Sequence, residues 1–405
     1  MQIPLSLLPR SIFLKALGRS IETYSFDAVL FVAGFSIAIA LNLFEASRWA
    51  FVLYPGLLIT KSIVGRVVNE RVSTGLHLGT IYSRLTGNTR VFLDVFRDTV
   101  LVTVLMGLTI SFFSWVLGVA FWGFTVADLV EMSVALISTL GLSLLVFPLT
   151  EKLVFEAFNR GVDLERFIHP STFALSGLIS TGIYSSVLTL LLGLGVEGAY
   201  AAIALAVLLI AVAFLDALLR VKDAGFKRFV LSFLPVFFLS AIISSVAGMV
   251  FGKISALSLG LPEIFTVYPA LIFVGANLGL VVGTSATTKL ALGLLRPDFR
   301  SIGHHGGQIL AGWAASVLVF AVLSGVSLAV NGGSRLAFVG DLVAVLLLSN
   351  VIAVAMIVLV AYSFAVLAFQ RGFELESVAI PAEETFSILM MTIALFVALV
   401  VFHYV

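Results

Sequence analysis

The segment from Tyr268 to Gly293 reads YPALIFVGANLGLVVGTSATTKLALG, and it determines the fold class in two ways. It is a run of mostly apolar and small residues that is long enough to cross about 30 Å of hydrocarbon as a helix. It also aligns without gaps onto YPGLLITKSIVGRVVNERVSTGLHLG, which begins at Tyr54, and ten of the 26 aligned pairs are identical. The segment therefore predicts both a membrane span and an internal duplication.

The composition of the whole chain supports a membrane protein. Hydrophobic residues make up 60% of the 405 positions and charged residues 11%. Soluble domains are roughly half apolar and about a quarter charged, so a soluble fold could not bury this much apolar surface. The chain has no cysteine, which excludes disulfides and thiolate metal sites.

Eleven apolar runs are long enough to span a bilayer as helices. They cover residues 28–46, 49–70, 98–121, 127–150, 171–193, 199–219, 229–251, 261–283, 307–330, 338–369 and 383–403. We therefore expect an all-α, polytopic membrane protein with about eleven transmembrane helices. Residues 1–25 carry three basic residues among apolar ones at helical spacing, which favours an amphipathic segment on the cytoplasmic membrane surface over a cleavable signal peptide.

The distribution of Lys and Arg predicts the orientation. With a cytoplasmic N-terminus, nearly all of these residues lie in cytoplasmic loops or span ends, and only Arg48, Lys253 and Arg335 lie on the other side. Cytoplasmic loops of membrane proteins carry such an excess of basic residues. We expect a multi-pass protein of the cell membrane whose C-terminus is extracytoplasmic.

Two further pairs of segments extend the internal match in the same order. VADLV at Val126 matches VGDLV at Val339, and RGVDLERFIHPSTFALS at Arg160 matches RGFELESVAIPAEETFS at Arg371. Three matches in sequence predict a duplicated unit of five spans.

The apolar run 199–219 matches neither repeat, and it adds one crossing between two units of five spans. Both repeats then face the same way, related by a pseudo-two-fold axis along the membrane normal. The predicted organisation is a first repeat at 26–196, a connector helix at 197–222 and a second repeat at 223–405. The chain would then be a pseudo-dimeric monomer.

At the repeated segments the sequence resembles the MgtE magnesium transporter family and, in its duplicated layout, the eukaryotic MgtE-like solute carriers. The resemblance rests on PALIFVGANLG at Pro269, and on PGLLITK at Pro55 followed by RVST at Arg71. It implies a membrane domain, over roughly residues 26–405, that moves Mg²⁺, and other divalent cations with it, along a pathway between the repeats. The cytosolic regulatory domains of bacterial MgtE are absent from this chain.

The sequence departs from the family where the resemblance implies an Asp in the last span of each repeat, because Gly177 and Ile388 occupy these positions. In the second repeat Glu383 and Glu384 follow Pro381 closely, and Glu384 lies one helical turn before Ile388. These two glutamates are candidates for a shifted acidic site.

Mg²⁺ prefers oxygen ligands and loses its water reluctantly. Asn277 offers an amide oxygen at membrane depth, and Gly275 and Gly279 allow the backbone to open or a neighbouring helix to approach. These three residues are candidates for the ion pathway; the alternative is a packing face of small residues with one interhelical hydrogen bond.

Lys61 is aligned with Gly275, so the two repeats cannot offer a cation the same chemistry. It could pair with a carboxylate or act as a fixed charge in the pathway, or its side chain could extend to the membrane interface.

The remaining candidates are two pairs of aligned residues. Asp128 and Asp341 could concentrate cations at the outer mouth, although an Asp in the first turn of a helix is a common cap. Thr74 and Thr288 could line the inner end of the pathway, although threonine often bonds back to its own helix.

An enzyme is not expected, because the chain lacks the signatures of zinc, serine and aspartyl intramembrane hydrolases. It also lacks a phosphate-binding loop, so neither a nucleotide nor a nucleic acid is an expected partner. We expect no cofactor, with Mg²⁺ as the transported ion and the lipid bilayer as the surrounding partner. The alternative within the same architecture is a transporter of another solute.

Overall fold

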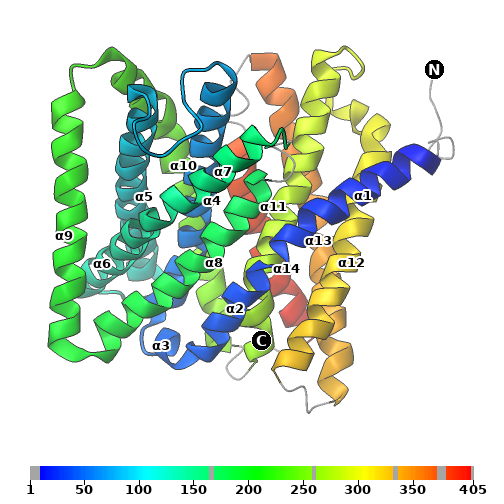
Figure 1. Cartoon of the computed structure of the whole chain (residues 1–405). Helices are drawn as coiled ribbons and strands as arrows, with labels where there is room; N and C mark the ends of the chain where they lie inside the picture. Colours follow the sequence, from blue (N-terminus) through cyan, green and yellow to red (C-terminus); the bar gives the residue numbers. More distant parts are fainter. Residues whose placement is uncertain are drawn as a thin grey trace. The chain divides into compact units, whose positions relative to one another are not determined.

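The computed structural model describes residues 10–162, 164, 168–257, 261–331, 336–371 and 380–402, and every regular element among them is a helix. The elements are α1 (Arg10–Asp27), α2 (Leu30–Ile39), α3 (Leu41–Glu45), α4 (Arg48–His77), α5 (Arg90–Trp122), α6 (Val126–Ser143), η2 (Leu144–Val146), α7 (Phe147–Asn159), α8 (His169–Leu188), η4 (Thr189–Gly193), α9 (Gly195–Arg220), α10 (Ala224–Leu257), α11 (Pro262–Ala291), η5 (Phe299–His305), α12 (Gly306–Val330), α13 (Leu336–Arg371) and α14 (Ile380–Val401). Figure 1 labels the α-helices.

Eleven stretches of the described chain are long and apolar enough to cross a membrane. This confirms the predicted all-α, polytopic architecture. The first stretch, Phe13–Ile39, begins earlier than the predicted run at 28–46, because α1 and α2 together form it. The described residues of the predicted surface segment 1–25 therefore belong to α1.

The chain divides into two compact units, which we call unit 1 (Met1–Phe31 and Lys253–Val405) and unit 2 (Val32–Gly252). This division differs from the predicted repeats in one respect. The helix α1, which precedes the first repeat, belongs to unit 1, and most of α10, which opens the second repeat, belongs to unit 2. The orientation of the two predicted repeats stays a prediction.

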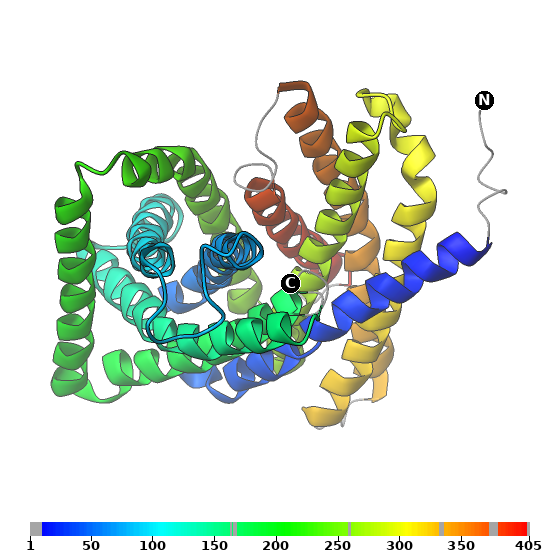
Figure 2. The same cartoon turned by 45° about the horizontal axis from the view of Figure 1, so that its top comes forward.

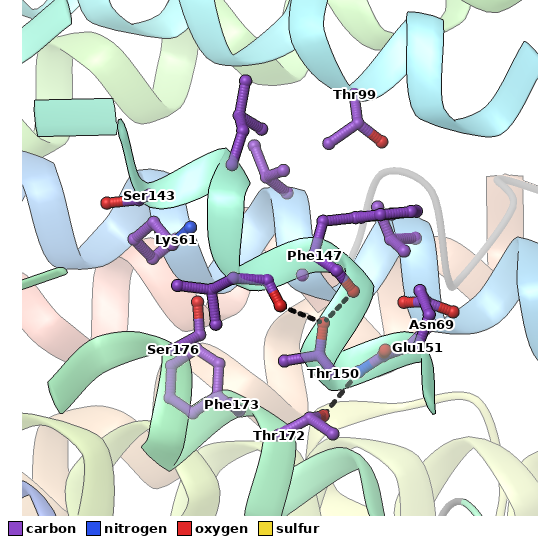
Figure 3. A pocket seen from close by; sticks show the side chains of 15 residues that line it. Lys61, Asn69, Thr99, Ser143, Phe147, Thr150, Glu151, Thr172, Phe173 and Ser176 are labelled. Atoms are coloured by element: carbon purple, nitrogen blue, oxygen red, sulfur yellow. Dashed lines mark hydrogen bonds between the residues drawn. The ribbon is translucent and has the colours of Figure 1, made fainter. Parts of the chain in front are cut away.

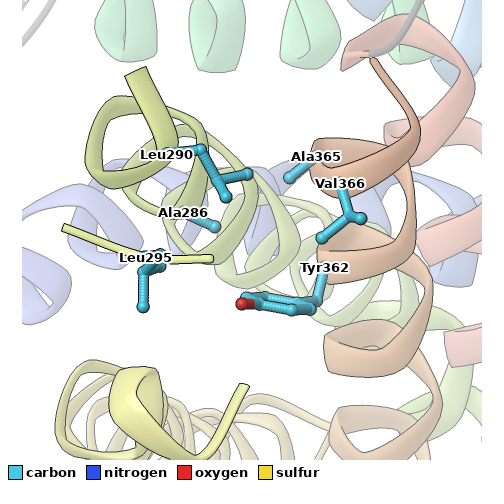
Figure 4. Close-up of a cluster of buried hydrophobic side chains, with 6 residues drawn as sticks. All are labelled: Ala286, Leu290, Leu295, Tyr362, Ala365 and Val366. Atoms are coloured by element: carbon cyan, nitrogen blue, oxygen red, sulfur yellow. The ribbon is translucent and has the colours of Figure 1, made fainter. Parts of the chain in front are cut away.

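In unit 1, α11 packs against α1, α12, α13 and α14. The end of α11 that is predicted to be cytoplasmic packs against α13 through a cluster that includes Leu290 and Tyr362 (Figure 4). The Tyr362 hydroxyl lies 2.6 Å from the Oγ of Ser301 in η5, so this buried ring has a polar partner as well as apolar neighbours. These interactions fix the end of α11 relative to α13.

In unit 2, α5 lies among α4, α6, α9 and α10 (Figure 2). The packing of α10 against α4 depends on two glycines, Gly248 and Gly252, spaced four residues apart. A methyl group at Gly248 would overlap the backbone carbonyl of Val52, so the two helix backbones touch. Glycines at this spacing allow such close packing of membrane helices.

One interhelical hydrogen bond occurs in both units at positions that the sequence alignment pairs. In unit 2 the hydroxyl of Tyr54 on α4 lies 3.1 Å from that of Thr181 on α8. In unit 1 the hydroxyl of Tyr268 on α11 lies 2.9 Å from that of Thr392 on α14. The pairing of α4 with α8 therefore resembles that of α11 with α14.

Candidate functional site

Polar side chains of α1, α11 and α14 in unit 1, which we call the acidic cluster, comprise the buried acids Asp27, Glu383 and Glu384 and the half-buried Asn277. Asp27 is the last residue of α1 and is 0% exposed. The Nδ2 of Asn277 donates to both of its carboxylate oxygens, at 2.9 and 2.7 Å. The amide nitrogen of Asn277 thus holds a carboxylate in place, and the predicted role of its amide oxygen as a ligand stays a prediction.

Glu384 on α14 is a second buried acid of this cluster. Glu384 is buried, and its charge acts on the carboxylate of Asp27. A buried acid inside an apolar span is costly, and such residues usually belong to ion or proton pathways. Two of them close together favour binding of a cation more strongly than one.

Glu383 lies against Gly279. A methyl group at Gly279 would overlap the Oε1 of Glu383 and would lie 2.8 Å from the Oγ of Ser387. That Ser387 hydroxyl donates to the same Oε1 at 2.7 Å. The absent side chain of Gly279 therefore makes room for a carboxylate from α14, which is a more specific role than the predicted close approach of helices.

Gly275 faces apolar groups instead. The three atoms nearest to a methyl group there belong to Ile357 and Met391, at 3.3 to 3.6 Å. This glycine thus lies at a packing position between α11, α13 and α14. Ile388, which occupies the position of the implied family Asp, is also buried.

The described residues include no group of three or more His, Cys, Asp or Glu side chains placed to hold a metal ion together. The acidic cluster is therefore not a cage for a dehydrated ion. One or two carboxylates facing an ion that keeps most of its water is the arrangement that Mg²⁺ commonly adopts in proteins.

Unit 2 contains a second candidate, which we call the polar cavity, with a volume of about 50 Å³. It lies where α6 ends and the chain passes through η2 into α7, a break that has no counterpart in the continuous helix α13. Its polar lining residues are Lys61, Asn69, Thr99, Ser143, Thr150, Glu151, Thr172 and Ser176. Figure 3 shows Lys61 and Ser143 toward one end of the cavity, and Asn69 and Glu151 toward the other.

Lys61 lies near the middle of α4 and is 8% exposed. No carboxylate among the described residues lies within ion-pair distance of its Nζ, and the side chain lines the cavity. Among the described residues it therefore has no acidic partner, and it does not extend to the end of its helix.

Glu151, on α7, is a buried acid that the sequence analysis missed. It is 1% exposed, and its Oε2 has no hydrogen-bond partner among the described residues. The helical pattern contains a signal for it, because Glu151 shares one face with Val154 and Phe155, which are also buried. An acid on the apolar face of an amphipathic helix is a candidate for function.

Asp27 was also missed, because its partner Asn277 lies 250 positions away. The signal available was a single acid at the start of an apolar run, FDAVLFVAG from Phe26. In the structure α1 ends at this residue, and the chain turns at Ala28 and Val29 before α2 begins. Interrupted helices at membrane depth often border ion sites.

The other predicted residues lie outside both groups. Thr288 is exposed and its hydroxyl donates to the carbonyl of Thr284, while Thr74 is exposed near the end of α4. Asp128 forms a capping box with Thr125 at the start of α6. Asp341, near the start of α13, is half-buried.

Comparison of the chain with protein-family models, with curated proteins and with solved structures finds no match. The resemblance to the MgtE family therefore depends on the quoted segments alone. An apolar bundle of eleven helices is the form of a membrane transporter in general.

Proposed function

We propose that the protein transports divalent cations, with Mg²⁺ as the first candidate, and that the acidic cluster of unit 1 binds the ion. The observation that carries this proposal is the burial of Asp27 within apolar helices, with Asn277 donating to both oxygens of its carboxylate and the buried Glu384 acting on it electrostatically. Two acids that share a buried site favour a divalent cation, which neutralises both charges.

The arrangement also fits the chemistry of Mg²⁺. The Asp27 carboxylate, held by an amide donor, can accept hydrogen bonds from the water around the ion, and Glu384 supplies a second negative charge. The ion then needs to lose few of its water molecules to pass. We propose no catalytic step for this site, in line with the absence of enzyme signatures from the sequence.

The test is Mg²⁺ flux into proteoliposomes that contain a Mg²⁺-sensitive dye, together with growth of a host that depends on added magnesium. Asp27→Asn keeps the shape of the side chain and removes its charge. We expect flux to fall by about tenfold or more, which corresponds to ~1.4 kcal/mol. Asn277→Leu should have a similar effect, because it removes the donor that positions Asp27.

Asp94→Asn is the matched control, since Asp94 is exposed and pairs with Arg97 of its own helix, at 3.7 Å. If the wild-type protein carries another solute and no Mg²⁺, the ion is wrong although the transporter class stands. If Mg²⁺ moves equally well through Asp27→Asn, the acidic cluster is not the ion site.

A further inference from the structure

The polar cavity contains two charged residues that the proposed ion site does not use. Lys61 lines it from α4, and Glu151 lines it from α7. Lys61 and Asn69, which lies near Glu151 in Figure 3, are eight residues apart on α4, or about 12 Å along the helix axis. The two charged groups therefore lie at separate ends of the cavity and do not form an ion pair.

Glu151 is unusual because one of its oxygens is buried without a hydrogen-bond partner among the described residues. An ionised carboxylate in this state costs several kcal/mol, whereas a neutral carboxylic acid costs much less. Apart from Lys61, the residues that line the cavity with Glu151 are neutral, among them Thr99 on α5, and Thr172 and Ser176 on α8.

The other charged residues of α7 lie on its opposite, exposed face. Lys152 and Glu156 are both exposed, and Glu156 pairs with Arg160 at 2.7 Å. The charged residue that faces the cavity from α4 is Lys61. Nearby Asp98 on α5 is held by Arg71 and Arg220, at 2.6 and 2.7 Å, so its charge is already balanced.

Eight of the fifteen residues that line the cavity are polar, and the cavity is large enough for water. A water molecule needs roughly 10 to 15 Å³ of such space, so a volume of about 50 Å³ accommodates roughly four. Water there would supply the missing hydrogen bond of Glu151 and a route for protons through the hydroxyl groups of Ser143, Thr150 and Thr172.

We propose that the polar cavity is a proton-binding site in which Glu151 takes up and releases a proton through water. On release, the O–H bond of the carboxylic acid breaks, its electron pair stays on the carboxylate, and the proton passes to a water molecule in the cavity. Uptake is the reverse. Lys61 lies at the other end, where its protonated form disfavours entry of a divalent cation.

The proposal that this proton is coupled to transport rests on the proposed function. The proposal that Glu151 binds a proton does not depend on it. Binding is tested by infrared difference spectroscopy on the purified full-length protein at a series of pH values. We expect the C=O stretching band of a protonated carboxyl group near neutral pH, its disappearance at higher pH, and its loss in Glu151→Gln. Glu156→Gln, on the same helix and exposed, should retain the band.

Coupling is tested in proteoliposomes that contain a pH-sensitive dye and are given a Mg²⁺ gradient without a pH gradient. We expect the lumenal pH to change with wild-type protein and with Glu156→Gln, and the change to be lost in Glu151→Gln. Absence of a band that depends on Glu151 overturns the proton site, whatever ion the protein carries. An equal change of pH in wild type and Glu151→Gln overturns the coupling, and failure to move Mg²⁺ with the band intact counts against the proposed function alone.

Discussion

The two units differ in the side chains at aligned positions of two helix pairs, α11 with α14 in unit 1 and α4 with α8 in unit 2. In unit 1, Glu383 from α14 fills the space beside Gly279 on α11. In unit 2 the aligned residues are Thr172 and Gly65, and nothing lies within 4 Å of a methyl group at Gly65. The shorter Thr172 side chain instead meets Asn69 on α4, at 3.4 Å, and the polar cavity lies beside them.

The contacts that pack the helices are therefore shared by the two units, whereas the charged residues beside those contacts are not. Both units keep the hydrogen bond between a tyrosine and a threonine, and both keep a glycine one turn beyond the middle of the central helix. The charged residues around that glycine differ completely. Two units that share this packing can therefore differ in chemistry, with an acidic cluster in unit 1 and a water-sized cavity with one lysine in unit 2.

The largest expected effect comes from adding a methyl group at each of these glycines. Gly279→Ala should destabilise the protein by about 1 to 3 kcal/mol, because the new atom overlaps the Glu383 carboxylate and crowds Ser387. Gly65→Ala should change stability by less than about 0.5 kcal/mol, since the space there is open. Thermal unfolding of both variants in detergent, followed by tryptophan fluorescence, measures the difference.

The double variant Gly279→Ala with Glu383→Ser provides the control, because it removes the carboxylate that the methyl group meets. We expect it to recover most of the loss of stability, as contacting residues couple in a double-mutant cycle. Equal losses of stability in Gly279→Ala and Gly65→Ala would contradict the difference in space around these two glycines.

A smaller effect is expected at the hydrogen bond that the units share. Tyr54→Phe and Tyr268→Phe each remove one hydroxyl from a buried pair, and each should cost about 0.5 to 1.5 kcal/mol. The threonine partners stay satisfied, because Thr181 and Thr392 also donate to carbonyls of their own helices, at 3.0 and 2.8 Å. The two losses should therefore be equal within error in the same unfolding experiment.

Tyr362→Phe serves as a comparison outside the repeated pair, since its hydroxyl contacts Ser301 instead. A loss at Tyr54 without a matching loss at Tyr268 would show that only one unit depends on this hydrogen bond, which would weaken the case for a common packing scheme.

Much of the architecture could be predicted from the sequence, because a bilayer constrains both length and composition. Eleven apolar runs correspond to eleven span-length stretches, and only the first shifted substantially, from 28–46 to Phe13–Ile39. The shift arises because Arg10, Lys15 and Arg19 made residues 1–25 look interfacial, whereas α1 packs along α12 in unit 1.

The candidate sites were only partly predictable. Asn277, Glu383 and Gly279 stood out by type and spacing, and the structure brings all three into or against the acidic cluster. Asp27 and Glu151 did not, because the role of each depends on a helix break and on partners from distant parts of the chain. Sequence patterns within one helix carry no information about such partners.

The smallest expected effect concerns the two threonines predicted to line the inner end of the pathway. Thr288 is exposed and bonds back to the carbonyl of Thr284 at 2.9 Å, and Thr74 is exposed at the equivalent end of α4. Neither contacts the acidic cluster or lines the polar cavity.

Thr74→Val and Thr288→Val keep the shape of the side chain, so each should change Mg²⁺ flux by less than about twofold, or ~0.4 kcal/mol. The flux assay used for Asp27→Asn provides the measurement. A drop in flux of about tenfold in both threonine variants would instead support a pathway lined by the ends of α4 and α11.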